Sequence, residues 1–385
     1  SMALAYCLKR WTKRQCVALV VEHGLRDESA AEAKTVKKRL QKMGFETEIL
    51  PWKHGAVSGK LHEKARSARY GLLTEACRRL GANDLLLAHH RGDQAETILM
   101  RLAKGSGIDG LAGIPEQAER DGIRLLRPFL SLPKERLIAT CREAKMAFVM
   151  DPSNGSEKYA RGRLRKIMPL LASEGLTIDN LTVLGARAKE AKAALDHATR
   201  EFIKKSAKTG AGGSVRFDRA ALCAVPREIA IRALVAGLRY VHDGDYPPEY
   251  ASLSGLMDAI EEKKHEGART LYGCIASIAE KKVTLLREPS AATETLSLLP
   301  GSSVLWDGRW LVSASPKAKP VTVRALGSLP HDLLDSLAPD LRRRIPEGRI
   351  RACLPALWDG EKHRAIPSFD KKPPFWAVYV KRAIS

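Results

Sequence analysis

The sequence lacks the marks of a membrane-spanning, secreted or metal-ribbon protein. No apolar run approaches the roughly 18 residues that a transmembrane helix requires, and no signal peptide is recognisable. The seven cysteines lie far apart without a Cys-x-x-Cys pair, which argues against a zinc ribbon and against a thiol-relay enzyme. We therefore expect a cytoplasmic chain with reduced thiols and no membrane partner.

Aromatic and acidic residues are both scarce. Aromatics make up 5% of the chain, so few platforms for base stacking are available. Against 44 acidic residues stand 65 lysines and arginines, which gives a formal net charge of +21. Because phosphates attract basic side chains, this excess predicts a nucleic acid partner. A generally basic soluble protein is the alternative, and an anionic membrane surface fits less well.

The first part of the chain alternates strands and helices. Apolar, β-branched runs predict strands, and capping patterns with periodic apolar residues predict helices between them. The predicted strands are 16–22, 45–50, 84–88 and 147–150, and the predicted helices are 29–43, 61–80 and 133–146. Such alternation predicts an α/β fold with a doubly wound, mainly parallel sheet.

The pattern changes after residue 169. Helices are predicted over 179–205, 220–240 and 252–263, followed by short strands near 270–278 and 282–287. After a polar linker at 288–299, the strand candidates are 304–312, 320–324 and 377–380. At 385 residues the chain is long enough for two or three domains. We predict an α/β domain over 1–169, a mainly helical domain over 170–290 and a small α+β domain over 300–385.

The strongest local feature lies between residues 84 and 107. A short apolar strand ends in His89 and His90, and a helical pattern with Asp93 and Glu96 in its first turns follows. In open α/β sheets this carboxyl edge is where ligands bind. The two acids share one helix face and could hold an ammonium group or magnesium. Alternatively, they only stabilise the helix N-terminus against its dipole.

Four motifs in order carry a resemblance to a known family. They are Val21–Glu32 (VEHGLRDESAAE), Leu61–Tyr70 (LHEKARSARY), His89–Gly113 (HHRGDQAETILMRLAKGSGIDGLAG) and Asp151–Leu170 (DPSNGSEKYARGRLRKIMPL). Each motif alone is weak, but four in register are specific. Together they resemble the bacterial tRNA(Ile)-lysidine synthetases, members of the N-type ATP pyrophosphatase group. The resemblance implies an adenine nucleotide alpha-hydrolase-like fold for the first domain.

Two departures from the family pattern affect the expected site. The family usually has two aspartates before the glutamine, whereas here Gly92 leaves only Asp93. The family also opens with a strand and a Ser-Gly-Gly-x-Asp-Ser loop, whose backbone N–H groups cradle pyrophosphate. This sequence begins Ser1-Met2, so the resemblance implies that the first strand and most of this loop are missing. Ser1 is then either the last residue of the loop or an unrelated residue before a start methionine. A sheet without its central strand would also expose an edge.

The resemblance implies a reaction and a set of residues. ATP activates the 2-position of the wobble cytidine of tRNA(Ile) with a CAU anticodon by adenylation and releases pyrophosphate, and the lysine ε-amine then displaces AMP to give lysidine. The implied catalytic residues are Asp93, Glu96 and His89, the last as a polar ligand or proton acceptor. The implied lysine- or ATP-binding residues are His23, Arg26, His90, Gln94, Arg161, Arg163 and Arg165. ATP, lysine and tRNA(Ile) are the expected partners, with Mg²⁺ bound through the phosphates. A homodimer is one arrangement open to the chain.

Simpler interpretations stand beside these. Either histidine could be packed at the strand end, each arginine could belong to a solvated helix turn, and the Arg69 stem could pack beside Tyr70. For Lys104–Gly107 we favour a helix C-cap over an anion site, and for the tryptophans 306, 310, 358 and 376 mostly core positions over base stacking. A related tRNA thiolase is disfavoured by the absence of Cys-x-x-Cys. A non-catalytic tRNA-binding protein that has lost adenylation is the alternative from another class.

Overall fold

The computed structural model describes residues 1–24, 29–54, 61–148, 160–242, 248–262, 266–327, 345–346, 348–369 and 374–380. The chain divides into two compact units, Ser1–Lys192 and Ala193–Ser385, and their boundary falls within one long helix, α8 (Ile178–Ser206). None of the described helices is long and apolar enough to cross a membrane. The three-domain division at 169 and 290–300 stays a prediction.

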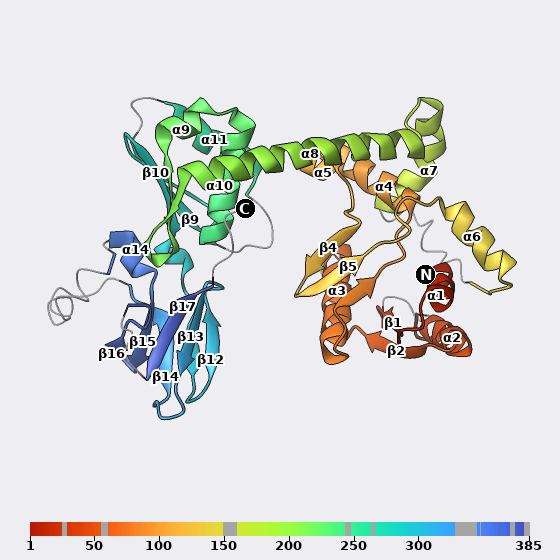
Figure 1. The fold of residues 1–385 in the computed structure, drawn as a ribbon, viewed down its shortest axis with the longest axis horizontal. Helices are drawn as coiled ribbons and strands as arrows, with labels where there is room; N and C mark the ends of the chain where they lie inside the picture. Colours follow the sequence, from red (N-terminus) through yellow and green to blue (C-terminus); the bar gives the residue numbers. More distant parts are fainter. Residues whose placement is uncertain are drawn as a thin grey trace. The chain divides into compact units, whose positions relative to one another are not determined.

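Unit 1 alternates helices and strands along most of its length (Figure 1). Its elements are α1 (Met2–Trp11), β1 (Val17–Glu22), α2 (Ser29–Lys42), β2 (Glu46–Pro51), α3 (Leu61–Arg79), β3 (Asp84–Leu86), α4 (Arg91–Leu102), α5 (Ile108–Leu111), β4 (Gln117–Arg120), β5 (Ile123–Leu126), α6 (Lys134–Glu143), α7 (Ala160–Ser173) and the start of α8. The predicted strands at 16–22, 45–50 and 84–88 and the helices between them are confirmed. For the strand predicted at 147–150, Ala147 and Phe148 are irregular and the other two residues lie outside the described ranges.

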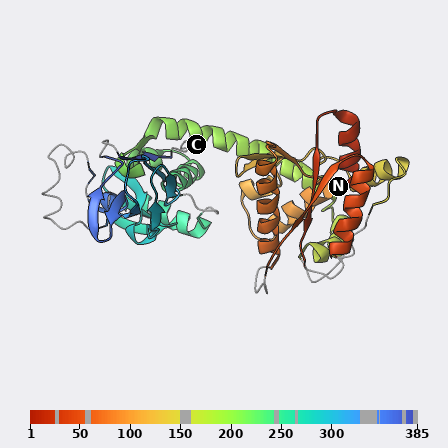
Figure 2. The same cartoon turned by 90° about the horizontal axis from the view of Figure 1, so that it is seen from below.

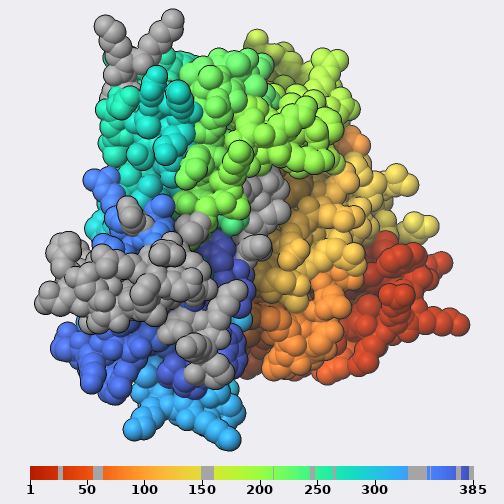
Figure 3. Space-filling model, turned by 60° about the vertical axis from the view of Figure 1, so that its left-hand side comes forward, coloured from red at the N-terminus to blue at the C-terminus, as the bar shows by residue number. Residues whose placement is uncertain are grey.

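Strand β1 lies between two apolar clusters, one on each of its faces. Leu19 and Val21 pack into a cluster with α3, whereas Ala18 and Val20 pack into a second cluster with α1, α2 and α6. Because alternate residues of a strand point to opposite faces, β1 is covered by helices on both sides. Figure 2 shows helices on either side of these strands, and in Figure 3 the red, orange and yellow residues form one continuous packed surface. This confirms the expected α/β fold.

Among the described residues, the strands of unit 1 pair in two groups. β1 pairs with β2 in parallel, and β3 pairs in parallel with β5, which also pairs with the antiparallel β4. Within the described residues no ladder joins β1 to β3, although both strands pack against α3. The hairpin β4–β5 is absent from the predicted elements. Its turn, Asp121-Gly122, has positive φ at both residues, which is the signature of a tight hairpin.

Unit 2 contains a mixed α/β part followed by a β-rich part. The elements are the end of α8, β6 (Ala207–Thr209), β7 (Val215–Asp218), α9 (Arg219–Ala224), α10 (Arg227–Val241), α11 (Tyr250–Glu261), β8 (Gly267–Leu271), β9 (Cys274–Ile278), β10 (Lys282–Arg287), β11 (Leu296–Leu298), β12 (Ser303–Trp306), β13 (Trp310–Ala314), β14 (Val321–Ala325), α14 (Gly348–Ala352), β15 (Pro355–Asp359), β16 (Lys362–Ala365) and β17 (Phe375–Tyr379). Three sheets result, ordered β6-β7-β10-β9-β8, β11-β14-β15-β16 and β12-β13-β17.

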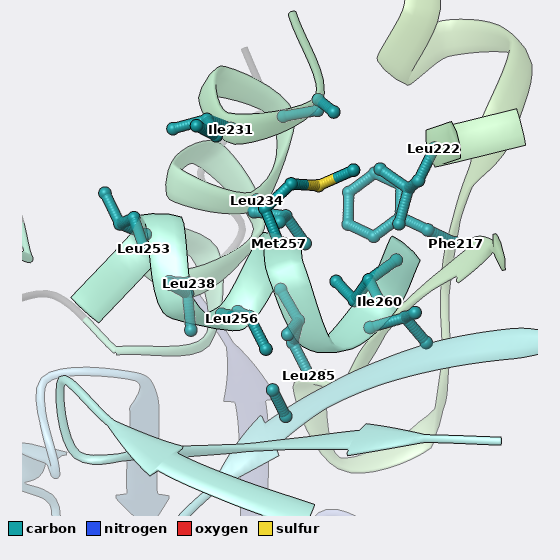
Figure 4. Packing of buried hydrophobic residues seen from close by; sticks show 14 of the residues in the cluster. Phe217, Leu222, Ile231, Leu234, Leu238, Leu253, Leu256, Met257, Ile260 and Leu285 are labelled. Atoms are coloured by element: carbon teal, nitrogen blue, oxygen red, sulfur yellow. The ribbon is translucent and has the colours of Figure 1, made fainter. Parts of the chain in front are cut away.

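Two predicted runs in unit 2 are interrupted. The helix predicted over 220–240 is two helices, because Pro226 stands between α9 and α10 and begins the second. The strand predicted over 304–312 is the hairpin β12–β13, whose turn Asp307-Gly308 again has positive φ at both residues. In the first part of the unit, α10 and α11 pack Leu234, Leu238 and Met257 over β10 (Figure 4).

Arg219 is a buried cation that closes the end of α11. It is 5% exposed and donates from Nε to the carbonyl of Ile260 (2.8 Å), from Nη2 to that of Glu262 (2.5 Å) and from Nη1 to that of Ala279 (3.2 Å). These carbonyls are the helix C-terminal acceptors and a turn acceptor that would otherwise lack donors.

Replacing Arg219 by methionine should therefore lower the free energy of unfolding by about 2–4 kcal/mol, because buried acceptors lose their donor. Urea denaturation followed by circular dichroism measures the change. Arg216→Met, at an exposed position of the neighbouring strand β7, is the matched control. Equal effects of the two substitutions would contradict this assignment.

Candidate functional site

Four of the predicted site residues lie just after β3 and in the first turns of α4: His89, His90, Asp93 and Glu96. The β3–β5 ladder extends to the hydrogen bond from Leu87 N to Leu126 O (2.8 Å), and His89 and His90 follow. Gly92 N donates to Nδ1 of His90 (3.1 Å), and His90 N donates to Oδ2 of Asp93 (2.9 Å). These reciprocal bonds cap the first turn of α4. The helix-stabilising interpretation therefore holds for one oxygen of Asp93.

Glu96 is held by an arginine of another helix. Its carboxylate is 7% exposed and accepts from Arg165 Nε at 2.5 Å and from Arg165 Nη2 at 3.2 Å. This contact raises the pKa of Arg165. Arg161, one turn earlier on α7, has its Nε 4.0 Å from Glu96, while Arg163 between them is exposed. The three arginines thus spread around α7, and two of them face the same carboxylate.

His89 lies among several charges. Burial is the main cause that lowers the pKa of its imidazole to about 4; Asp93 opposes this shift, and the nearby cations Arg127, Arg69 and Arg66 contribute to it. Its Nδ1 is shut off from solvent and has no hydrogen-bond partner among the described residues. At neutral pH His89 is therefore uncharged.

The positive charge of Arg69 acts on several titratable groups of the site. Its charge acts on His23, whose pKa is lowered chiefly by burial. It also acts on the α-amino group of Ser1, whose pKa is lowered chiefly by burial, while Cys141 and Asp93 oppose this shift. Desolvation by neighbouring atoms likewise lowers the pKa of Arg69, although the residue is exposed. The start of α1 therefore lies beside Asp93 and Arg69.

Gln94 has a mainly structural environment. Ile114 N donates to its Oε1 (2.6 Å), and its Nε2 donates to Ile114 O (3.1 Å), so the amide braces the loop before β4. Gly113, at φ +73°, lets this loop approach, since a Cβ there would lie 2.7 Å from Gln94 Oε1. Arg26 lies outside the described residues. The ligand-binding roles of Gln94, Arg26 and the other residues above stay predictions.

Sequence reasoning missed one side chain near the site. Arg66 lies over the Tyr70 ring at 5.2 Å, because residues four apart share a helix face, and packing of the Arg69 stem beside Tyr70 stays a prediction. Arg127 was not anticipated at all. It follows the short strand Ile123–Leu126, in which buried Ile123 and Leu125 alternate with exposed Arg124, and the β3–β5 pairing places residue 127 at the carboxyl edge of the sheet.

Residues 1–171 match a family model described as a PP-loop domain. A tRNA(Ile)-lysidine synthase from Rhodopseudomonas palustris is 38% identical over 75% of this chain and 88% of its own length. The corresponding protein of Ruegeria pomeroyi is 35% identical over 94% of this chain and 84% of its own. The chain belongs to the tRNA(Ile)-lysidine synthase family. The curated members of this family are enzymes, and the PP-loop domain is an ATP-binding domain. A further synthase of the family, from Methylobacterium sp. (strain 4-46), is 43% identical over 75% of this chain and 86% of its own length.

A solved structure, the U34-tRNA thiolase NcsA from Methanococcus maripaludis with its 4Fe-4S cluster, aligns with a TM-score of 0.43 and 16% identity. The alignment covers 49% of this chain and 68% of that chain.

The lowered pKa of His89 predicts a pH dependence of stability. In the unfolded chain the imidazole has its ordinary pKa near 6.5, so between pH 6.5 and about 4 the unfolded chain binds more protons than the folded one. The contribution of His89 is therefore fully present above pH 6.5 and is lost as the pH falls toward 4. His89→Gln should lose less stability than the natural chain over this window in denaturant titrations. An unchanged slope would contradict the assignment, and His197→Gln, at an exposed position of α8, is the control.

The Glu96–Arg165 pair predicts a loss of stability on truncation. Arg165→Met leaves a buried carboxylate without its bidentate donor and should cost about 1–3 kcal/mol of unfolding free energy, the lower part of the range reflecting the partial exposure of Arg165. Thermal and urea unfolding measure the loss. Arg187→Met, at an exposed position of α8, should change stability by less than about 0.5 kcal/mol. If the two variants unfold alike, the pair does not stabilise the site.

Proposed function

We propose that the chain ligates lysine to C2 of the wobble cytidine of tRNA(Ile) with a CAU anticodon. ATP adenylates the cytidine and leaves as pyrophosphate and AMP in two steps, and the product is lysidine. Support comes from relatives that carry this name over most of their length, from the PP-loop domain, and from the net charge of +21. The observation that carries the proposal is the cluster of His89, Asp93 and Glu96 with arginines at the carboxyl edge of the sheet.

ATP would bind where cations outnumber acids. Around Asp93 and Glu96 lie the guanidinium groups of Arg66, Arg69, Arg127, Arg161 and Arg165. We place the triphosphate near Arg66 and Arg69, beside the N-terminal end of α1, since helix N-termini and arginines both favour phosphate. Mg²⁺ would be carried by the phosphates rather than by a cage of carboxylates.

Lysine must be held as an ammonium ion, release one proton to solvent and then attack as an amine. We place the ammonium group on Oδ1 of Asp93, because Oδ2 accepts the backbone N–H of His90. Arg69 and Arg161 lie close enough to Asp93 and Glu96 to disfavour a second positive charge, which lowers the pKa of a bound amine. Arg161 is also placed to meet the α-carboxylate of lysine.

The tRNA would bind through basic side chains and exposed rings. Trp306 is fully buried and Trp310 is 5% exposed, which confirms core positions for both. Trp376 is 45% exposed on β17 and is the remaining candidate for stacking on an unpaired base. Trp358 is half-buried and has Arg324 over its ring at 4.2 Å.

Asp93→Asn should reduce lysine incorporation into a tRNA(Ile) transcript at least about 100-fold, since the amide cannot balance the ammonium charge. Incorporation of labelled lysine with ATP measures the rate on the complete natural chain, and filter binding measures tRNA affinity, which should stay within about twofold. Asp84→Asn is the matched control at the opposite end of β3, where Asp84 pairs with Arg124.

Incorporation by Asp93→Asn at the natural rate would remove Asp93 from the reaction. If the natural chain binds tRNA and ATP but incorporates no lysine, the ligation proposal fails, and a non-catalytic tRNA-binding protein becomes the better description.

A further inference from the structure

Arg127 is a buried cation with unusually few partners. Its residue is 6% exposed, its Nη1 donates to Pro115 O (2.8 Å), and its Nε has no hydrogen-bond partner. Within the described residues no carboxylate forms an ion pair with it. Arg219, equally buried, donates to a ring of carbonyls, and buried Arg287 pairs with Asp307 at 2.8 Å. Burying a charge without such partners is costly, so few contacts offset the desolvation free energy of the Arg127 guanidinium.

The sheet topology places Arg127 at the carboxyl edge of the sheet, beside the candidate site. Leu86 pairs with Leu126 in the parallel β3–β5 ladder, so residue 127 leaves β5 where residues 87–89 leave β3. Arg127 also holds the loop before β4, both through Pro115 O and through its own N–H to Glu116 O (2.9 Å). One part of its role is therefore structural, as it is for Gln94.

The remaining part concerns His89. The charged groups that act on this imidazole come from three places: Asp93 on α4, Arg66 and Arg69 on α3, and Arg127 after β5. Three cations against one carboxylate make a protonated imidazole unfavourable, and the half-buried position adds to this. The Nδ1 of His89 and the Nε of Arg127 are both closed to solvent and unpartnered in the described residues.

We propose that Arg127 is a positioning residue that, together with burial, keeps His89 uncharged, so that His89 contacts substrate as a neutral hydrogen-bonding group and does not take the proton of lysine. This choice between polar ligand and base was open from the sequence alone. The proposal rests on the proposed function for the identity of the substrate, whereas the state of His89 belongs to the free protein.

The chemistry agrees with a neutral role. A lysine ammonium has an ordinary pKa near 10.4, and the pKa of His89 is about 4, so direct proton transfer is unfavourable by roughly six orders of magnitude. Even an amine whose pKa is lowered by several units would remain the stronger base. A neutral imidazole offers one N–H donor and one acceptor, which suits orientation of a ribose, base or phosphate group.

The decisive experiment is a pH titration of the His89 ring nitrogens by NMR in the substrate-free protein labelled with ¹⁵N-histidine. In the natural chain His89 should stay neutral well below pH 6. Arg127→Met, which removes the charge but keeps the bulk, should move its pKa upward. Arg127→Lys, which keeps the charge, should leave it low. Titration of His89 near pH 6.5 in the natural chain, or an unchanged pKa in Arg127→Met, would overturn the proposal.

Two controls separate charge from loop bracing. Gln94→Ala removes a brace of the same loop but no charge, and should leave the His89 pKa low. Arg124→Met removes an exposed charge from the same strand and should do the same. A rise in Gln94→Ala equal to that in Arg127→Met would show that loop collapse, not charge, moves the titration, and would refute the proposal. Because no substrate is present, these outcomes are independent of whether lysine is ligated.

Discussion

The contact between Arg165 and the buried carboxylate of Glu96 holds the candidate site together. It joins α7 to α4, next to an apolar cluster in which Ile98 and Leu99 meet Leu181. Figure 1 shows α4 and α7 side by side. Without this pair a carboxylate would be buried alone, and the helix that carries Asp93 would lose a fixed neighbour. The geometry of β3, His89 and Asp93 therefore depends on an ion pair between residues 69 positions apart.

The Glu96–Arg165 ion pair gives Asp93 and Glu96 different surroundings. Spacing alone predicts that Asp93 and Glu96 share a helix face and act together. In the folded chain Asp93 turns toward His90, and Glu96 turns toward Arg165. Asp93 therefore uses one oxygen in the helix cap, and its other oxygen is where we propose that the substrate ammonium binds, while Glu96 is paired with an arginine. Electrostatics, rather than spacing, divides their roles.

The sequence predicts local elements well and long-range pairings poorly. Strand 17–22 and helix 178–206 follow from local patterns that act within a few residues. The division of the unit 1 strands into two sheets and the ion pair at Glu96 depend on contacts between distant segments, which no local pattern encodes. The hairpins at Asp121-Gly122 and Asp307-Gly308 are a different case, because their Asp-Gly signal was present. Recognition of the first hairpin would have identified β5, but the parallel pairing of β5 with β3, which brings Arg127 to the same sheet edge as His89, is again a contact between distant segments.

An excess of cations at the site and a positive charge on the whole chain serve the same class of partner, one rich in phosphate. In the reaction that we propose, the cations at the site also favour a neutral lysine amine and a neutral His89 imidazole. The measurement that tests this account most directly is mass spectrometry of nucleosides from tRNA(Ile) incubated with the complete natural chain, ATP and ¹³C-lysine. The account predicts labelled lysidine in place of the wobble cytidine. An unmodified wobble cytidine, or one carrying sulfur, would contradict it.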